Sequence, residues 1–542
     1  MQRLVRVLLA FYLAAVLLFG QYGTGTILGT VTDPTGSVIP SVTVTAKNEA
    51  TNETRTFTTD ADGFYRFSAL LSGSYTITAT ARSFRTSSVS NLILTVNTQV
   101  RADITMQVGN ITEKVEVADT TPQLQTNTAA MGSVIDNRTV LELPLNNRNF
   151  FDLAALSPGS LRTVGTSSVM DSRSIDIGGV RNTSTGANLD GVDFTVVNQN
   201  NPGIALSVDA LAEFKVVANF MDASYGHGAA FIDMVTKRGT NAFHGVAYNF
   251  VRNRAFQAGQ FFRPASGAPR FTYNQPGVSA GGKIRKDKTF FFVNYEGRRR
   301  RTGVILQGLV PTDPMLAGNF AGTGKTIRDP LDNNTPFPGN VIPQSRFDPQ
   351  AQTMLQYFPH ANSAGRPGIN FLVTPSDWER RDQITGRIDH RVSNKGSLFG
   401  RYSYANDDLT NVAYIIGLGV IRPDRTQHLS VGYTHVFSPT LISDSRLGFF
   451  KAYLARQSDG DRYSTNYAAQ LGFKNLAAGP GDYTLPNINL TGYAPGFPGA
   501  SGGFVGYGTH IVQNNIYYRG GRIADLDSRR PHSEVWGSST RT

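Results

Sequence analysis

Apolar and polar residues alternate with a period of two along much of this chain. In residues 382–392, Ile384, Ile388 and Val392 share one face, while the other face carries Gln383, Thr385, Arg387, Asp389 and Arg391. Such alternation indicates a β-strand whose two faces meet different surroundings. Eight segments of this kind follow residue 243, and we predict antiparallel strands at residues 245–253, 277–284, 289–298, 382–392, 397–407, 427–437, 441–454 and 509–519.

The connections between these strands alternate between long and short. The long ones have roughly 20 to 80 residues, and the short turns are Arg285–Lys288, Ser393–Gly396 and Ser438–Thr440. Outer-membrane barrels have long outer loops and short periplasmic turns. The pattern predicts a transmembrane β-barrel with these turns in the periplasm. The basic run Arg298, Arg299, Arg300 and Arg301 is then expected at the cell surface.

Residues 24–109 contain a second kind of strand pattern, in which apolar residues alternate with Thr and Ser. The segments Asp33–Gly36 and Asp60–Gly63 are turn sequences, because Asp bonds nearby backbone groups and Gly accepts a positive φ. We predict a small antiparallel β-sandwich for this region.

The N-terminus indicates export. Arg3 and Arg6 precede an apolar run from Val7 to Phe19, which has the length of a signal-peptide core and is too short for a membrane-spanning helix. We predict a signal peptide at residues 1–20, with a short membrane anchor as the alternative. No other apolar run approaches 18 residues, so entry into a membrane would require a closed barrel.

Composition supports an all-β chain and excludes several chemistries. The 542 residues include 55 Gly, 33 Phe and 21 Tyr, a mixture that suits strands and tight turns, and no Cys. The eight His residues show no paired-ligand spacing, so neither a metal nor a cofactor is expected. No motif supplies a nucleophile, base and orienting group together, so an enzyme, including a secreted hydrolase, is not favoured.

The formal net charge of +11 raises the question of an anionic partner. Nucleic acid is not expected, because no recognition helix or RNA-binding motif accompanies the arginines. A solvated collar or contact with anionic lipid phosphates is favoured for Arg298–Arg301. The segment Gly322–Thr326 ends like a phosphate-binding loop, but Asn319 stands where that motif requires Gly.

One string resembles a known family closely. Residues 143–159, LPLNNRNFFDLAALSPG, are similar to the plug signature of Oar-like TonB-dependent outer-membrane proteins, and residues 178–195 and 208–253 continue the likeness in the family's order. The plug-signature residues are Leu143, Pro144, Leu145, Asn146, Arg148, Asn149, Asp190 and Gly191. Residues 25–84 resemble the carboxypeptidase regulatory-like domain, which has a carbohydrate-binding-like fold.

The resemblance implies a mainly β fold in several parts. These are a regulatory-like β-sandwich at 24–109, a small α/β plug at 110–240 and the N-terminal part of an outer-membrane barrel at 241–522. Asp190 and Asp193 are expected to form turns rather than to act in acid–base catalysis. Ala210–Phe214 is expected to be a helical turn that enters a strand, and Thr236–Asn241 is expected to link plug and barrel.

The same resemblance implies partners. In TonB-dependent receptors a short extended segment before the plug adds to a strand of a periplasmic energy-coupling protein. The candidate here comprises Glu113, Lys114, Val115, Glu116, Val117, Ala118 and Asp119, with a plain linker as the alternative. The chain is expected in the outer membrane with its sandwich in the periplasm, moving an unknown substrate such as a carbohydrate or peptide.

The alternative function for this chain is that of a surface-exposed adhesion or carbohydrate-binding protein. Eight strands enclose an interior that side chains just fill, so a barrel holding a plug should be larger, and the chain is expected to be part of a longer protein. Residues 523–542 lose the strand pattern, for which we hypothesise a frameshift near Arg522.

Overall fold

The computed structural model describes most of the chain in detail. The described residues are 24–109, 114–118, 131–143, 145, 148–162, 175–179, 185–196, 201–203, 206–218, 230–258, 267, 269–363, 368–411, 419–438, 441–455, 457–458, 466–472 and 511–525. The predicted signal peptide, Glu113, Asp119, Pro144, Asn146 and residues 526–542 lie outside this set.

The first part of the chain is a two-sheet sandwich. One sheet has the order β4-β1-β7, with β8 also paired to β1, and the other has the order β3-β2-β5-β6-β9. The strands are β1 Thr24–Thr32, β2 Thr43–Asn48, β3 Thr54–Thr58, β4 Phe64–Leu71, β5 Gly73–Thr80, β6 Thr86–Leu94, β7 Gln99–Arg101, β8 Ile104–Thr105 and β9 Lys114–Ala118.

The predicted turns of the sandwich form for the reasons given by their residues. The carboxylate of Asp33 accepts bonds from the backbone N–H groups of Thr35 and Ser37, at 2.8 and 2.9 Å. Gly36 has φ +86°, which a residue with a side chain rarely adopts. Between the sheets, Ile27, Val44 and Ile77 are fully buried, so the alternating apolar residues form the core.

The plug follows as a small α/β unit around a sheet of order β10-β17-β18-β13-β14. β13 is parallel to β18, and the remaining pairs are antiparallel. Its elements are β10 Met131–Asp136, α2 Asn137–Glu142, α3 Phe151–Ala154, β11 Ser160–Arg162, β12 Ile175–Ile177, β13 Thr185–Leu189, β14 Val192–Asp193, β15 Thr195–Val196, β16 Asn201–Pro202, η3 Val208–Ala210, β17 Leu211–Ala218 and β18 Ala230–Thr236.

One local expectation in the plug needs correction. The helical turn expected at Ala210–Phe214 ends at Ala210, and Leu211 to Phe214 already belong to β17. Pairing on both sides explains the difference, because β17 lies between β10 and β18 and its apolar side chains fill the plug core.

All eight predicted barrel strands are present and follow one another in a single antiparallel sheet. They are β19 His244–Asn253, β20 Phe271–Arg285, β21 Thr289–Gly303, β26 Ser376–Ser393, β27 Gly396–Asn411, β28 Val420–Ser438, β29 Leu441–Leu454 and β31 Ile511–Asp525. Within the described residues, β19 and β31 are the two edges of this sheet and do not pair with each other. The mainly β fold class is confirmed.

Most of these strands are longer than predicted, and the added length lies mainly beside the long loops. For example, Arg299–Gly303 of β21 pairs with Ser376–Arg380 of β26, beyond the segments with clear alternation. Backbone hydrogen bonds can continue where the apolar pattern stops. β31 likewise reaches Asp525, past the proposed frameshift position, and the frameshift itself stays a prediction.

The two faces of the barrel sheet differ as the alternation predicts. On β26, Ile384 and Ile388 are 51% and 52% exposed, whereas Gln383 and Thr385 are 6% and 3% exposed. Apolar side chains therefore point outward and polar side chains point toward the plug. This is the reverse of a water-soluble sandwich and is the arrangement of a transmembrane barrel.

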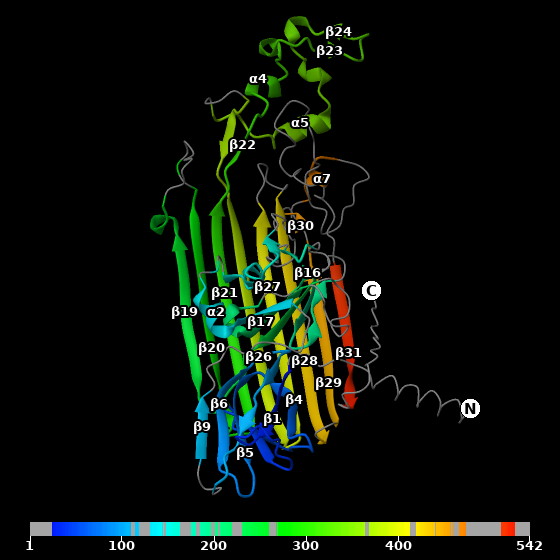
Figure 1. Ribbon diagram of the computed structural model, residues 1–542. Coiled ribbons are helices and arrows are strands. Elements are labelled where there is room, and N and C mark those ends of the chain that lie inside the picture. Colours follow the sequence, from blue (N-terminus) through cyan, green and yellow to red (C-terminus); the bar gives the residue numbers. More distant parts are fainter. Residues whose placement is uncertain are drawn as a thin grey trace, which may run out of the picture.

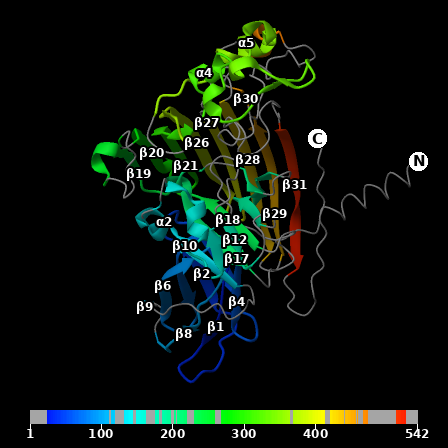
Figure 2. The ribbon, with the colours of Figure 1, turned by 90° about the horizontal axis from the view of Figure 1, so that it is seen from above.

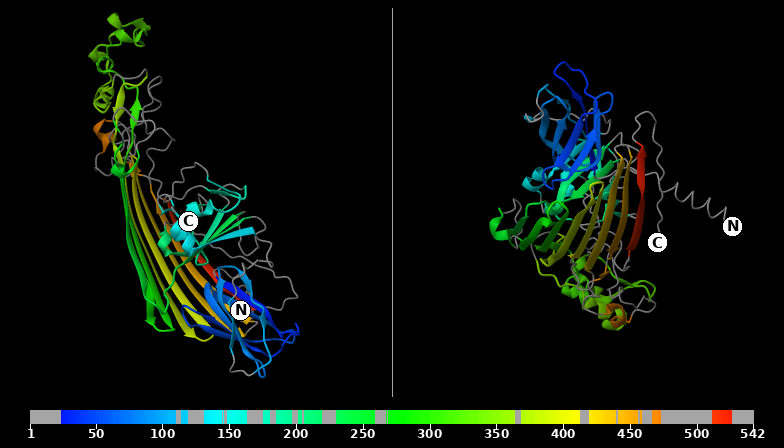
Figure 3. Two further views of the ribbon diagram at one scale, coloured as in Figure 1. Left: turned by 60° about the vertical axis from the view of Figure 1, so that its left-hand side comes forward. Right: turned by 90° about the horizontal axis from the view of Figure 1, so that it is seen from below.

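The three parts are stacked along the barrel strands. In Figure 1 the sandwich, in blue, lies at the end of the strands where the short turns are, and the plug, in cyan, lies above it. Views from above and from the side show a curved sheet with the plug on its inner side (Figures 2 and 3). The sandwich therefore lies on the side predicted to be periplasmic.

The long connections form the opposite end of the molecule. They contain β22 Leu306–Gly308, α4 Asp313–Leu316, η6 Ala321–Thr323, β23 Arg328–Asp329, β24 Thr335–Pro336, η7 Pro338–Asn340, η8 Gln344–Arg346, α5 Pro349–Leu355, β25 Phe371–Val373, β30 Gln457–Ser458 and α7 Tyr467–Gln470. Gly322–Thr326 lies here, beside η6, and not between a strand and a helix. Among the described residues, no helix is long and apolar enough to cross a membrane.

Candidate functional site

The candidate site is the ionic interface between the plug and the inner face of the barrel sheet. Arg387 of β26 and Arg401 of β27 are direct cross-strand neighbours on that face. Both are buried, and Arg401 is only 1% exposed. Like charges placed opposite each other destabilise a sheet unless an anion compensates them. That anion comes from the plug.

Asp190 supplies the compensating carboxylate. Its Oδ1 accepts a bond from Arg387 Nη1 at 2.9 Å, and its Oδ2 accepts one from Arg401 Nε at 2.9 Å. The backbone N–H and hydroxyl of Thr236, at the end of β18, complete its shell at 3.0 and 2.9 Å. Thus one plug carboxylate bridges two barrel strands.

The hairpin between β13 and β14 places this carboxylate. Asp190 and Gly191 form a two-residue turn with φ values of +51° and +78°, the type that favours Asp-Gly. A Cβ on Gly191 would lie 1.7 Å from Nη1 of Arg446. That same Nη1 donates to the backbone carbonyl of Asp190 at 2.9 Å. Arginines of β26, β27 and β29 therefore hold the turn, and the prediction that Asp190 is a turn former holds in the structure.

The ionisation of Asp190 follows from these contacts. Burial alone raises the pKa of a carboxyl group, but the guanidinium groups of Arg387 and Arg401 and the two bonds from Thr236 outweigh it. Together they lower the pKa of Asp190 to about 2. The carboxylate is therefore charged at neutral pH and can pair with both guanidinium groups.

A second polar cluster joins the plug to the other half of the sheet. Glu296 of β21 accepts bonds from Gln275 and Gln383 at Oε1, at 2.8 and 2.6 Å. Its Oε2 accepts from Tyr248 of β19 at 2.7 Å and from the plug hydroxyl of Ser207 at 3.1 Å. This buried barrel carboxylate therefore receives four hydrogen bonds, one of which comes from the plug.

The signature residue Arg148 lies beside this cluster. Its guanidinium group pairs with Asp209 of the plug, and its Nε is 4.0 Å from Glu296 Oε2. It also lies over the ring of Phe250 on β19, with 4.4 Å between Cζ and the ring centroid. Arg148 thus contacts both plug and barrel.

The remaining signature residues support the plug itself. Asn149 Oδ1 accepts the backbone N–H of Phe151 at 3.0 Å, at the start of α3. Leu143 and Leu145 pack against the plug core, and Pro144 and Asn146 lie outside the described residues. The signature string is therefore partly a folding motif and partly, through Arg148, an interface motif.

The sandwich is bonded to the end of the plug that faces the short turns of the barrel sheet. The backbone N–H of Val96 donates to Glu213 Oε2 at 2.6 Å, and Asn97 Nδ2 donates to Asp233 Oδ2 at 2.6 Å. Lys215 Nζ returns a bond to the Asn97 carbonyl at 2.8 Å. Burial raises the pKa of Glu213 and lowers that of Lys215. The β6–β7 loop is thus anchored to β17 and β18.

A third contact connects the sandwich to the barrel. Asp287, in the turn between β20 and β21, accepts bonds from Asn52 of the sandwich at 3.0 Å and from Asn241 at 2.8 Å.

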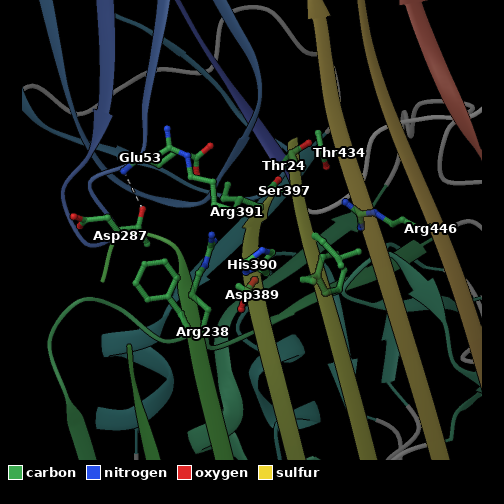
Figure 4. A pocket seen from close by; sticks show the side chains of 15 residues that line it. Thr24, Glu53, Arg238, Asp287, Asp389, His390, Arg391, Ser397, Thr434 and Arg446 are labelled. Atoms are coloured by element: carbon green, nitrogen blue, oxygen red, sulfur yellow. Dashed lines mark hydrogen bonds between the residues drawn. The ribbon is translucent and has the colours of Figure 1, made fainter. Parts of the chain in front are cut away.

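Beside this contact lies a pocket of about 600 Å³, including space open to solvent. Figure 4 shows its charged lining from all three parts, with Glu53, Arg238, Asp389, Arg391 and Arg446 among the labelled side chains.

The candidate coupling segment takes a defined place. Its residues Lys114–Ala118 form β9, which pairs in parallel with Thr86–Ser90 of β6. β9 is an edge of the five-stranded sheet, so its other edge carries no strand among the described residues. An edge strand of this kind is compatible both with the coupling segment and with the alternative of a plain linker between sandwich and plug.

The four consecutive arginines, Arg298–Arg301, point alternately to the inner and the outer face of the barrel sheet. Arg298 is 4% exposed and points inward, where it pairs with Glu379 at 3.2 Å, so its assignment to an exposed basic cluster was wrong. Arg300 also bonds Glu379, at 2.9 Å. Arg299 and Arg301 occupy the outward positions. A period of two makes this division unavoidable.

Sequence reasoning missed the barrel residues that hold the plug. Arg401 and Arg446 were noted only as parts of strands, although their signal was present, since each is a charged residue on the polar face of an alternating segment. Nothing in the sequence specified that Asp190 would lie between Arg387 and Arg401. Among the described residues, no group of three or more His, Asp or Glu could hold a metal ion.

Comparisons with known proteins agree with this architecture. A family model described as an outer membrane beta barrel domain matches residues 235–520, and one described as a carboxypeptidase regulatory-like domain matches residues 26–107. The TonB-dependent transporter Oar of Myxococcus xanthus is 25% identical over 306 residues, which cover 52% of this chain and 28% of that protein. The chain therefore spans less than a third of that relative's length.

Two solved structures are similar in part. The outer membrane transporter YddB from Escherichia coli is 13% identical with a TM-score of 0.41, over 61% of this chain and 40% of that chain. The siderophore receptor PirA from Acinetobacter baumannii is 15% identical with a TM-score of 0.37, over 67% and 43% of the two chains.

A sheet with apolar side chains outside, charged side chains inside and a small α/β unit on its inner face defines a plugged outer-membrane barrel as the class of protein. The match to residues 235–520 makes the particular family explicit. The chain belongs to the outer membrane beta barrel domain family, and it is an outer-membrane protein with an N-terminal carboxypeptidase regulatory-like domain.

Proposed function

We propose that this chain forms part of a TonB-dependent transporter or receptor of the Oar type, in which the plug is released from the barrel by energised movement. The observation that carries the proposal is the plug turn at Asp190, held by three arginines of the barrel sheet. Ion pairs and hydrogen bonds are strong where water is excluded and weaken when water reaches them, so they suit an interface that must open.

The proposed energy-coupling element is β9 with its flanking residues, Glu113–Asp119. Extended segments at a sheet edge add partner strands through backbone hydrogen bonds, which supply affinity without side-chain specificity. The edge position of β9 supports this assignment. The partner is a periplasmic TonB-type protein, and the chain acts through binding and movement rather than covalent chemistry.

The substrate is proposed to enter from the side of the long loops and to meet the plug there. This side is opposite the sandwich, which occupies the end with the short turns. The chemical identity of the substrate does not follow from the loops, and both carbohydrate and peptide remain within the proposal.

Cysteine cross-linking tests the coupling assignment directly, because the chain has no native Cys. Single Cys substitutions at each position from Glu113 to Asp119 are paired in whole cells with Cys residues in the strand of the TonB-type partner. Strand addition predicts efficient cross-links at alternate positions, since side chains alternate along a strand.

The matched control is a Cys at Thr56 in β3, the opposite edge of the same sheet. Val117→Pro should abolish the cross-links of its neighbours, because Pro removes a backbone donor. Cross-links that are absent throughout the segment, or equal at β3 and β9, would reject the assignment.

A further inference from the structure

The outer face of the barrel sheet carries an apolar band with a sharp upper limit. On β26 the exposed apolar residues run from Val392 to Ile384, eight residues apart. With about 3.3 Å per residue and a tilt of about 40°, this corresponds to roughly 20 Å of membrane thickness, close to the usual band of such barrels. The next outward positions toward the long loops, Asp382 and Arg380, are charged.

Four outward arginines lie just beyond this limit, on β21, β26 and β28 of one sheet, with β27 between the last two strands. Arg299 of β21 and Arg380 of β26 are direct cross-strand partners, and Arg301 pairs with Trp378. Arg425 of β28 is bonded to Asn406 of β27 at 2.9 Å. We name the set Arg299, Arg301, Arg380 and Arg425 the arginine collar.

The collar is incompletely neutralised by protein groups. Asp382 accepts bonds from both Arg299, at 2.6 Å, and Arg380, at 3.4 Å, so one carboxylate serves two guanidinium groups. Asp408 of β27, the direct cross-strand partner of Arg380, is the only other acidic residue among the described outward positions at this level, so two carboxylates face four arginines. The side chains of Arg299 and Arg380 remain 39% and 63% exposed.

We propose that the arginine collar binds the phosphate groups of anionic lipids in the outer leaflet. The guanidinium fork matches phosphate oxygens in a bidentate manner, and two like charges placed opposite each other favour a shared anion. A membrane lipid fits better than free phosphate, because its acyl chains would lie on the apolar band directly below, at Ile384 and Ile388. The proposal rests on the outer-membrane location of the chain and not on transport.

The purified full chain in detergent micelles, titrated with diphosphorylated lipid A and followed by native mass spectrometry, tests the proposal. Arg299→Gln/Arg380→Gln should weaken binding about 30-fold, since each basic residue near an anionic surface contributes roughly a factor of five. The control Lys286→Gln/Lys288→Gln removes the same charge from the turn at the other end of the band. It should change binding less than about twofold.

Two further arms separate phosphate recognition from fold damage and from other anions. Asp382→Asn removes the competing carboxylate and should tighten binding, whereas damage to the fold would weaken it. Dephosphorylated lipid should bind the parent chain as weakly as lipid A binds the double variant. If the double variant fails to fold, Arg380→Gln alone should weaken binding about fivefold.

Several results would overturn the proposal. These are equal binding of phosphorylated and dephosphorylated lipid, equal losses in the two double variants, or weaker binding by Asp382→Asn. Displacement of the lipid by inorganic phosphate at equal concentration would show that the site takes free phosphate and not a lipid.

Discussion

Replacing Asp190 with Asn should loosen the contact between the plug and the barrel sheet. Asp190→Asn keeps the size of the side chain but removes the one carboxylate that bonds Arg401 among the described residues. Arg401 is fully enclosed, and its remaining bonds go to Ser403 and to the carbonyl groups of His428 and Leu189. An uncompensated buried charge of this kind costs about 3 to 5 kcal/mol.

Hydrogen exchange measured by mass spectrometry can locate this loss. Peptides that cover β13, β14 and β18 should exchange about 150- to 4000-fold faster in Asp190→Asn, because each 1.4 kcal/mol in the opening free energy changes the rate about tenfold. Peptides from the sandwich core should be unchanged. The control Asp348→Asn alters the exposed N-cap of α5, where Asn serves as well as Asp, and should leave all peptides unaffected.

A second change at Arg401 should reverse this effect. Removing the orphaned cation with Arg401→Gln should restore much of the protection lost in Asp190→Asn, because the cost comes from the unpaired charge. An increase in exchange below about tenfold in Asp190→Asn, or no recovery in the double variant, would refute the assigned role of this ion pair.

Three further predictions concern the same interfaces. Gly191→Ala should make the amides of β13 and β14 exchange faster, because the added Cβ would collide with Arg446. The control is Gly179→Ala: Gly179 has φ +79° but no atom near the position of a Cβ, so this change should cost only the backbone strain of a positive φ, about 1 to 2 kcal/mol. Acid should weaken the protection of the plug amides from hydrogen exchange. The pKa of Asp190 is lowered to about 2, so its contribution to stability, about 2 kcal/mol, is fully present above about pH 4 and is lost as the pH falls toward 2. The pH dependence of exchange in Asp190→Asn should lack this loss. Glu213→Ala should lower the free energy of opening of the β6–β7 loop by about 1 to 3 kcal/mol, which would be seen as faster exchange at residues 94–98. Glu49→Ala, on the exposed surface of the sandwich, should leave this exchange unchanged.

The strands were predictable because each one faces two different media. In β26, Ile384 is exposed on the outer face and its sequence neighbour Gln383 is buried on the inner face. The sequence shows this contrast as an alternation of apolar and polar residues. The strand ends were less predictable. Beyond Arg298 the pairing of β21 with β26 is maintained by backbone bonds and ion pairs, which leave no period in hydrophobicity.

The interface residues could be predicted as a class but not as pairs. The inward position of Arg387 and its need for an anion follow from the alternation, but its partner Asp190 lies 197 residues away in sequence. Only the docking of the plug brings them together. The same holds for Val96 and Glu213, because a backbone donor in a loop has no sequence signal at all.

The unequal attachment of the sandwich has a mechanical consequence. The plug carboxylates that it bonds, Glu213 and Asp233, are buried residues, whereas Asp287 of the barrel turn is half-buried and its bond is more open to competition from water. Under tension the wetter contact breaks first, so sandwich and plug would travel as one body. Because the sandwich lies at the short-turn end of the barrel strands, it would obstruct movement of the plug toward the long loops.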